Sequence, residues 1–180
     1  MTPAPPAPLL LRGVGVDVCQ VARLARAHAR FGERLLRRAF HPAEAARFAA
    51  LLARAPPASA HAFLASRWTA KEALHKALGA HRLLFPDVEV VRGEAPPAGI
   101  AGVAAAAAAA DDDDPPRVPL AAVPAQLGAA LSLPLAAAQG APHFRFHGAA
   151  AAHMAAHGFG APLLSLSHDG EYAVAFVVLQ

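Results

Sequence analysis

The sequence predicts an α+β fold, and three observations support this prediction. Strand-like and helix-like segments follow one another in mixed order instead of alternating strictly. A long helix is predicted over residues 59–78, which includes the only tryptophan of the chain. Near the C-terminus, two β-rich runs flank Asp169-Gly170, a dipeptide that favours a type I′ hairpin and therefore an antiparallel pair of strands.

The remaining elements follow from periodicity, prolines and glycines. The elements expected in chain order are a strand at 13–18, a helix at about 20–38, a helix at 42–54 with Pro42 in its first turn, a proline-containing loop at 55–58, the long helix at 59–78, a strand at about 87–92, a strand at 143–147, a helix at 149–157 and the terminal hairpin. The hairpin would carry His168 and Glu171 at its tip.

The most informative segment runs from Arg67 to Gly79, because it places Glu72 and Lys76 one helical turn apart. Four apolar positions of this helix fall within about 40° of one line, and Glu72 points away from them; they are Phe63, Ala70, Leu74 and Ala77. The opposite side carries little bulk, so we expect a carboxylate and an ammonium free to meet a ligand. Lys71 projects about 100° away from Glu72, which favours a role in anchoring the helix.

A second carboxylate, Asp17, stands alone among the apolar residues of Val14–Val18, a pattern that predicts a short buried strand. A buried carboxylate without a partner shifts its pKa or is held by hydrogen bonds or a metal ion, so Asp17 is a candidate ligand. The alternative is a turn-forming Asp after Gly-x-Gly. No third glycine follows at the spacing of a dinucleotide-binding fingerprint.

Two further patterns have weaker functional interpretations. His153 and His157 lie four residues apart in an Ala-rich helix, a spacing that can chelate zinc when other ligands join, but no Glu or Cys accompanies them and a packing or solvent-facing pair is favoured. The segment 93–141 holds seven consecutive alanines, an aspartate run at 111–114 and many prolines, so we expect a low-complexity insertion there with a solvated acidic run.

Four segments together resemble a known family, the 4′-phosphopantetheinyl transferases, and within it the short holo-[acyl-carrier-protein] synthase group. The segments are Gly13–Val18, Phe31–Glu44, Arg67–Gly79 with its Trp-x-x-Lys-Glu-x-x-x-Lys core, and Ser165–His168. The resemblance covers residues 11 to 92 and 139 to 179, and it implies a single-copy transferase fold in which an antiparallel sheet packs on a long helix. The whole chain, 1–180, would then be one transferase domain with an insertion at about 93–141.

The activity implied by the resemblance is transfer of the 4′-phosphopantetheine group from coenzyme A to a serine of an apo acyl carrier protein. The second product would be adenosine 3′,5′-bisphosphate. The resemblance also implies a Mg²⁺ ion held by Asp17 and Glu72, and Mg²⁺ is indeed usually bound by one or two carboxylates together with substrate phosphates. The base that accepts the serine proton stays open among a magnesium-bound water, Asp17 and Glu72.

The same resemblance assigns residues to the coenzyme. Lys76 matches a lysine that reaches the phosphates, Arg67 an arginine at the nucleotide end, and His168 a histidine near the adenosine phosphate that a neighbouring subunit can supply. Gly79 matches a position where backbone approaches the nucleotide, although a helix C-cap explains this glycine equally well. Asp17, Glu72 and Lys76 are therefore the expected catalytic residues.

Charge points to the carrier protein as the partner. Residues 23–38 carry six arginines and a single acid, Glu33, and acyl carrier proteins are typically acidic. In the resemblance, Arg23 pairs with carrier carboxylates, and Arg30 and Phe31 belong to the docking helix. A solvated basic face is the alternative for every one of these arginines except Arg23. Nucleic acid is disfavoured as a partner, because no aromatic residues interleave with the arginines to stack bases.

Composition limits the remaining possibilities. At 180 residues the chain has room for one copy of the unit, and single-copy members of the family build the active site between subunits, so a homotrimer is implied. Cys19 cannot form an intramolecular disulfide and is expected to pack as a small apolar residue. No signal peptide or membrane span is predicted, and the expected location is cytoplasmic, with an organelle such as the mitochondrion as the alternative.

Two other functions compete with the active transferase. One is a binding module of the same fold that docks carrier proteins without turnover, against which the joint presence of Asp17, Glu72, Lys76 and His168 argues. The other is RNA binding, which rests only on the arginine-rich helix and the formal net charge of +3.

Overall fold

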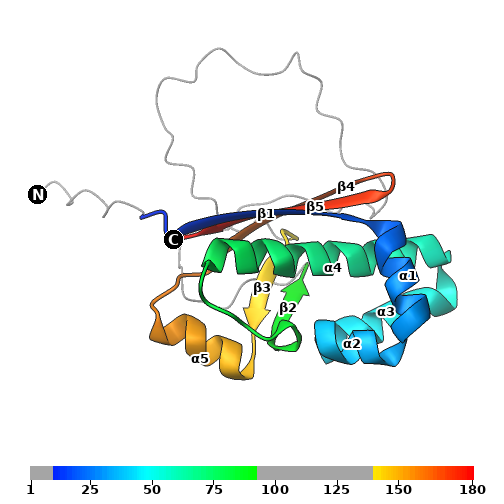
Figure 1. Ribbon diagram of the computed structural model, residues 1–180, viewed down its shortest axis with the longest axis horizontal. Helices are drawn as coiled ribbons and strands as arrows, with labels where there is room; N and C mark the ends of the chain where they lie inside the picture. Colours follow the sequence, from blue (N-terminus) through cyan, green and yellow to red (C-terminus); the bar gives the residue numbers. More distant parts are fainter. Residues whose placement is uncertain (1–9, 93–139) are drawn as a thin grey trace, which may run out of the picture. The chain divides into compact units, whose positions relative to one another are not determined.

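The computed structural model of the chain describes residues 10–92 and 140–180. Its elements in chain order are β1 (Gly13–Gln20), α1 (Val21–Phe31), α2 (Glu33–Ala39), α3 (Pro42–Arg54), α4 (Pro57–Leu78), the 3₁₀ helix η1 (Phe85–Asp87), β2 (Val88–Val91), β3 (His143–Phe146), α5 (Gly148–Ala156), β4 (Leu163–Asp169) and β5 (Tyr172–Leu179) (Figure 1). All of them belong to one compact unit, made of the described residues up to Arg92 and from Pro142 onward. The insertion predicted at about 93–141 lies, up to residue 139, outside the described residues.

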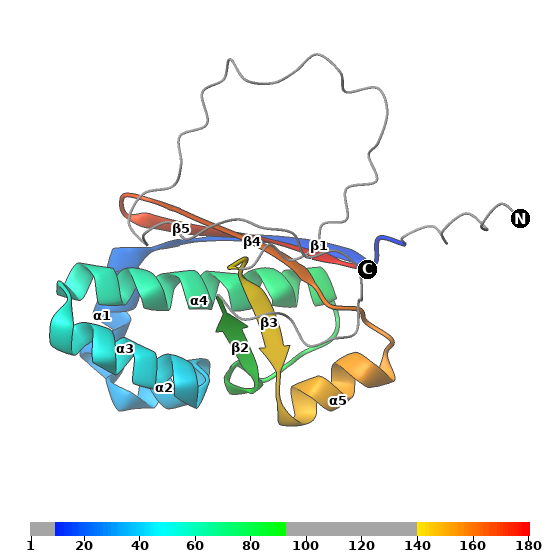
Figure 2. The same ribbon diagram turned by 180° about the vertical axis from the view of Figure 1, so that it is seen from behind.

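The strands form two antiparallel sheets. The larger sheet has the order β1-β5-β4, and the smaller one pairs β2 with β3. The long helix α4 runs beneath the larger sheet and contacts all three of its strands, and β2 packs on the same helix (Figures 1 and 2). This arrangement confirms the predicted α+β class with an antiparallel sheet on a long helix.

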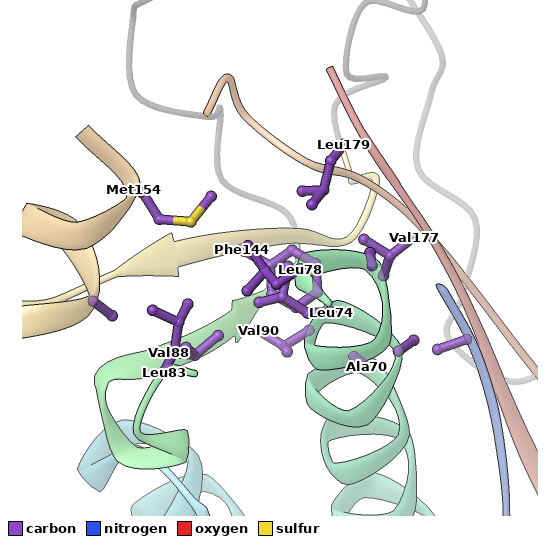
Figure 3. Close-up of a cluster of buried hydrophobic side chains, with 14 residues drawn as sticks. Ala70, Leu74, Leu78, Leu83, Val88, Val90, Phe144, Met154, Val177 and Leu179 are labelled. Carbon is purple, nitrogen blue, oxygen red and sulfur yellow. The ribbon is translucent and has the colours of Figure 1, made fainter. Parts of the chain in front are cut away.

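Two hydrophobic clusters hold these layers together. The first joins α4, β2, β3, α5 and β5, with Leu74, Phe144, Met154 and Val177 among its buried side chains (Figure 3). The second joins α1, α2, α3 and the first half of α4. Because α4 contributes to both clusters, it is buried on more than one side, and the single apolar line predicted for this helix describes only part of its packing.

The orientation of β1 differs from the prediction. Val14, Val16 and Val18 point away from α4 and are exposed, whereas Gly13 and Gly15 face the helix. A Cβ atom on Gly15 would lie 1.9 Å from the Ala73 carbonyl oxygen, and one on Gly13 would lie 2.1 Å from the Ala77 carbonyl oxygen. The Gly-x-Gly pattern therefore permits close contact between β1 and the α4 backbone. This contact, and not burial of the valines, decides which face of β1 points inward.

Two glycines also change predicted boundaries. The helix expected at 20–38 is divided, because Gly32 adopts a φ of 49° and caps α1 with its N–H on the His28 carbonyl. The hairpin turn lies one residue later than predicted: Asp169 pairs with Tyr172, and Gly170 with Glu171 forms the connection. Gly170, with a φ of 51°, takes the first central position of the turn. His168 is consequently a strand residue opposite Ala173.

The other predicted elements are confirmed to within two residues, including the start of α3 at Pro42. The His41 side chain and Glu44 form a capping box at this start. In the ranges 10–92 and 140–180, none of the helices has the length and apolarity needed to cross a membrane.

Candidate active site

The structure brings together two predicted site residues that are far apart in the sequence. Lys76, near the end of α4, donates hydrogen bonds of 2.8 Å to Asp17 Oδ1 and 2.9 Å to the Val16 carbonyl oxygen on β1. The Asp17 side chain faces the helix and is 16 % exposed, whereas that of Lys76 is 53 % exposed. The lysine expected to be free is thus paired with the aspartate, although its ammonium remains accessible to solvent.

Glu72 lies one helical turn before Lys76 and is half-buried. Within the described part of the chain its carboxylate has no hydrogen-bond or ion-pair partner. Burial raises the pKa of the Cys19 thiol, and Asp17 and Glu72 both add to this rise through their negative charge. Two carboxylates from different elements, β1 and α4, therefore act on the same small region of the protein.

A cavity of about 580 Å³ opens beside Glu72. One wall comes from the end of α1 and from α2, and the other from the segment that leads into η1. Its lining residues are Phe31, Arg34, Leu35, Arg38, Ala39, Trp68, Glu72, Leu83, Leu84, Phe85 and Pro86. The cavity is mostly apolar, with the Glu72 carboxylate and the arginines of α2 as its charged groups.

A second cavity, of about 250 Å³, lies at the C-terminal end of α4. It is lined by Glu72, His75, Lys76, Gly79, His81 and Arg82. Gly79 ends the helix with a φ of 64° and donates its N–H to the Lys76 carbonyl oxygen, which confirms its role as a C-cap. Glu72 lines both cavities and therefore stands at their junction, and the smaller cavity also has the cations Lys76 and Arg82 in its lining.

Lys71 fixes the orientation of this part of α4. Its side chain is fully buried, and its Nζ lies 2.5 Å from Glu44 Oε2 and 3.1 Å from the carbonyl oxygens of Ala39 and Phe85. Burial lowers the pKa of Lys71, against the opposing effect of Glu44. These contacts tie α4 to α2, α3 and η1, which confirms that Lys71 anchors the helix carrying Glu72.

Arg67 and His168, like Asp17, line neither cavity. Arg67 stacks on Phe63, with 4.0 Å between its guanidinium carbon and the ring centroid, and donates to Ser66 Oγ. Burial lowers the pKa of Arg67 to about 10, and its Nε has no partner among the described residues. His168 is exposed on β4, close to the hairpin turn. The structure of one chain does not bring these two residues to Glu72.

The three predicted docking residues lie on α1. Arg23 and Arg30 are exposed, and the Arg30 guanidinium carbon lies 5.0 Å from the centroid of the Phe31 ring. Because Phe31 also lines the larger cavity, the basic surface of α1 is continuous with the cavity that contains Glu72. The structure also places Arg34 and Arg38 in the lining of the larger cavity. The sequence had indicated only that these two arginines belong to a basic face. Their spacing of one helical turn was the available signal.

Comparison with known proteins agrees with this architecture. Residues 13–110 match the model of the 4′-phosphopantetheinyl transferase superfamily. The holo-[acyl-carrier-protein] synthase of Halorhodospira halophila is 34 % identical over 94 % of this chain and 98 % of its own length.

Solved structures show the same fold. The holo-[acyl-carrier-protein] synthase of Neisseria meningitidis superposes with a TM-score of 0.61 at 21 % identity, covering 95 % of this chain and 99 % of that one. The synthase of Helicobacter pylori, solved in complex with coenzyme A, gives a TM-score of 0.53 at 19 % identity, covering 93 % of this chain and 99 % of that one.

The chain therefore belongs to the 4′-phosphopantetheinyl transferase superfamily. Its nearly complete alignment with named synthases places it more narrowly. It is an enzyme of the holo-[acyl-carrier-protein] synthase type.

Proposed function

We propose that this enzyme transfers the 4′-phosphopantetheine group from coenzyme A to a serine of an apo acyl carrier protein in a Mg²⁺-dependent reaction. The serine oxygen would form a bond to the phosphorus that carries the pantetheine arm, and the pyrophosphate bond to the nucleotide would break. Adenosine 3′,5′-bisphosphate would leave, and the serine proton would pass to a base. The observation that carries the proposal is the position of Glu72. Its carboxylate has no partner among the described residues, and it lines both the mostly apolar larger cavity and the smaller cavity that contains Lys76 and Arg82.

Asp17 and Glu72 fit a magnesium ion by their chemistry. Mg²⁺ prefers oxygen ligands and typically takes one or two carboxylates, with water and substrate phosphates completing its coordination. Both side chains offer carboxylate oxygens, and Glu72 lacks a competing partner in the described ranges. When bound, the ion would neutralise charge on the pyrophosphate. Asp17 and Glu72 would hold it from β1 and α4, two elements whose close contact Gly13 and Gly15 permit.

Lys76 would supply the cation for the phosphates. Lys76 lines the smaller cavity and its side chain is about half exposed, so its ammonium can turn from Asp17 toward a bound anion. Phosphoryl transfer depends mainly on positioning and on charge stabilisation, which fixed cations provide. The backbone at Gly79 would approach the nucleotide in the same cavity. Arg67 and His168 would contact the nucleotide part of coenzyme A, a role that rests on the family resemblance.

The carrier protein would dock on α1 and reach the larger cavity. Arg23 and Arg30 present positive charge to an acidic partner, and Phe31 leads from this surface to the wall that contains Glu72. Charge complementarity of this kind steers association and sets orientation. The arginines of α2 extend the same positive surface along the cavity rim.

A homotrimer is supported by the outer face of the larger sheet. Six large apolar side chains are exposed there, at fractions from 36 % to 58 %; they are Val14, Val16, Val18, Tyr172, Val174 and Phe176. They lie together because β1 pairs with β5, with Val16 opposite Phe176. A contiguous apolar patch on a sheet face marks an interaction surface, and copies of this chain are the occupant that we propose.

Mass spectrometry of the intact carrier protein tests the reaction. An apo acyl carrier protein incubated with the enzyme, coenzyme A and Mg²⁺ should gain the mass of one phosphopantetheine arm, and chelator should prevent the gain. Chromatography of the same mixture should show adenosine 3′,5′-bisphosphate in equal amount. Carrier that binds the enzyme but gains no mass would support the docking module instead.

A further inference from the structure

Three histidines converge on the side of the protein where α5 meets the loop after α4. His153 and His157 come from α5 and its C-cap, and His81 comes from the loop. One nitrogen from each ring lies within 4.8 Å of the other two. The spacing of His153 and His157 was visible in the sequence, whereas the third ligand was not, because His81 is more than 70 residues away.

The distances suit a shared metal ion. His153 Nε2 lies 3.1 Å from His81 Nδ1. Two nitrogens bound to one tetrahedral Zn²⁺ at the usual bond length of ~2.0–2.1 Å are separated by about 3.4 Å. Little movement is therefore needed for both nitrogens to bind one ion. The same contact serves as a hydrogen bond when one ring carries the proton.

The third ring is oriented by the helix itself. His157 Nδ1 lies 2.9 Å from the His153 carbonyl oxygen, so this nitrogen is the donor of a hydrogen bond. The tautomer that results carries its lone pair on Nε2, the atom available to a metal. Histidine ligands of metal sites commonly donate their other ring N–H to a carbonyl in this way, which fixes the ring in its binding orientation.

Neighbouring aromatic packing supports the cluster. The His81 and His157 rings lie 4.4 Å apart between centroids, and Phe159 packs against both. Arg12 stacks on Phe159 and donates a 2.7 Å hydrogen bond to the Gly158 carbonyl oxygen, which holds the segment after α5 in place. The three rings are thus arranged by contacts outside the cluster.

A second group, His41 with Glu89 and His147, is less suited to a metal. Arg145 and His147 both contact Glu89 Oε2, at 3.4 and 2.9 Å. His41 Nδ1 accepts the Ala43 N–H at the start of α3. The atoms of this second group that could bind a metal are therefore occupied by structural contacts.

We propose that His81, His153 and His157 form a binding site for Zn²⁺ or a similar divalent transition metal, distinct from the carboxylates Asp17 and Glu72. Imidazole nitrogen favours such ions over Mg²⁺, and three histidines leave a fourth position for water. The ion would join α5 to the loop after α4. Because His81 also lines the smaller cavity, this link would reach the wall of the proposed coenzyme pocket.

Metal binding by the full chain tests the proposal without any activity assay. Metal-free protein is titrated with Co²⁺, whose visible absorption intensifies in tetrahedral nitrogen sites, and then with Zn²⁺ as competitor. Thermal melting is recorded with and without Zn²⁺. We expect one ion per chain, displacement of Co²⁺ by Zn²⁺, and a higher melting temperature in Zn²⁺.

Matched variants locate the ion. His153→Ala and the exposed His157→Ala should weaken binding at least about tenfold and abolish the melting shift. His61→Ala, which removes a histidine outside the cluster, and Asp17→Ala should bind like the original chain. Binding that is absent in the original chain, or that is unchanged in folded His157→Ala and lost in Asp17→Ala, would overturn the site. The test measures metal binding and melting temperature, not transfer, so failure of the proposed transfer reaction would leave it unaffected. Asp17→Ala separates the histidine site from the carboxylates.

Discussion

Lys71 and Glu44 form an ion pair that is excluded from solvent, with 2.5 Å between Nζ and Oε2 and side-chain exposures of 0 % and 2 %. Lys71 directly precedes Glu72 in the sequence, so the residue that anchors α4 is adjacent to the proposed metal ligand. Glu44 also accepts the backbone N–H groups of His41 and Val90. One carboxylate thereby connects α3, α4 and β2.

Removal of the lysine should destabilise the protein strongly. Lys71→Ala leaves the Glu44 carboxylate buried and unpaired, and breaking one partner of a buried pair costs about 3–5 kcal/mol. We expect this loss in the free energy of unfolding, measured by urea denaturation. Arg37→Ala, which removes an exposed cation from α2, should change it by no more than about 0.5 kcal/mol. Equal losses in the two variants would contradict the role of Lys71 as an anchor.

Gly15 should not tolerate a side chain. Gly15→Ala places a methyl group against the Ala73 carbonyl, where backbone must move to make room. Overpacking of this kind costs typically ~1–3 kcal/mol, and the displaced β1 would carry Asp17 away from Lys76. We expect a lower urea midpoint together with lower transfer activity. At Gly160 an added Cβ would lie 3.4 Å from its nearest neighbour, so Gly160→Ala should retain both properties.

The fold was predictable from the sequence where local signals agree with packing. The Pro42 start of α3, the long α4 and the terminal hairpin follow from prolines, periodicity and glycine, and all are present. The break at Gly32 was not predicted, because a glycine within an amphipathic pattern is compatible with a continuous helix and only its positive φ decides otherwise.

The inward face of β1 and the composition of the site required the structure. Alternating valines predict a buried face when a strand has one apolar side, but Val16 faces outward while Asp17 faces α4. The close contact of Gly15 with a helix backbone leaves no signal in residue hydrophobicity. The pairing of Asp17 with Lys76 and the joining of His81 to His153 depend on tertiary contacts between distant segments.

Glu72 is the residue on which transfer should depend most. Glu72→Gln removes a charge without changing the shape, and the loss of one group that stabilises transition-state charge typically lowers kcat by about 10²–10³. The binding of carrier protein, measured by calorimetry, should persist. Asp87→Asn, a change of the same kind on η1 outside the lining of both cavities, should retain activity. Full turnover by Glu72→Gln would show that the site is assigned wrongly.

Arg23 should affect docking and not chemistry. Arg23→Glu places a like charge against an acidic partner, so KM for the carrier protein should rise on the order of tenfold, ~1.4 kcal/mol, with little change in kcat. The effect should diminish at high salt, because exposed charges are screened. Arg54→Glu on α3 has the same change of charge away from α1. A similar rise in KM for that variant would indicate general electrostatic attraction in place of a docking site.

Phe176 should be required for assembly. Its side chain is 46 % exposed on the outer face of the sheet, so Phe176→Lys should leave the fold of a single chain intact while placing a charge in the proposed interface. Light scattering after size exclusion should show trimers for the original chain and monomers for the variant. Leu52→Lys, which changes an exposed leucine on α3, should leave the trimer intact.

The separation of His168 from Glu72 gives the same interface a functional readout. If a neighbouring subunit supplies His168, a trimer mixed from Glu72→Gln and His168→Ala chains contains some sites with both groups intact. Each variant alone should be nearly inactive, and unfolding and refolding them together should restore part of the activity. Phe176→Lys in both chains should prevent this recovery. Mixed trimers without recovered activity would show that His168 acts within its own chain or not at all.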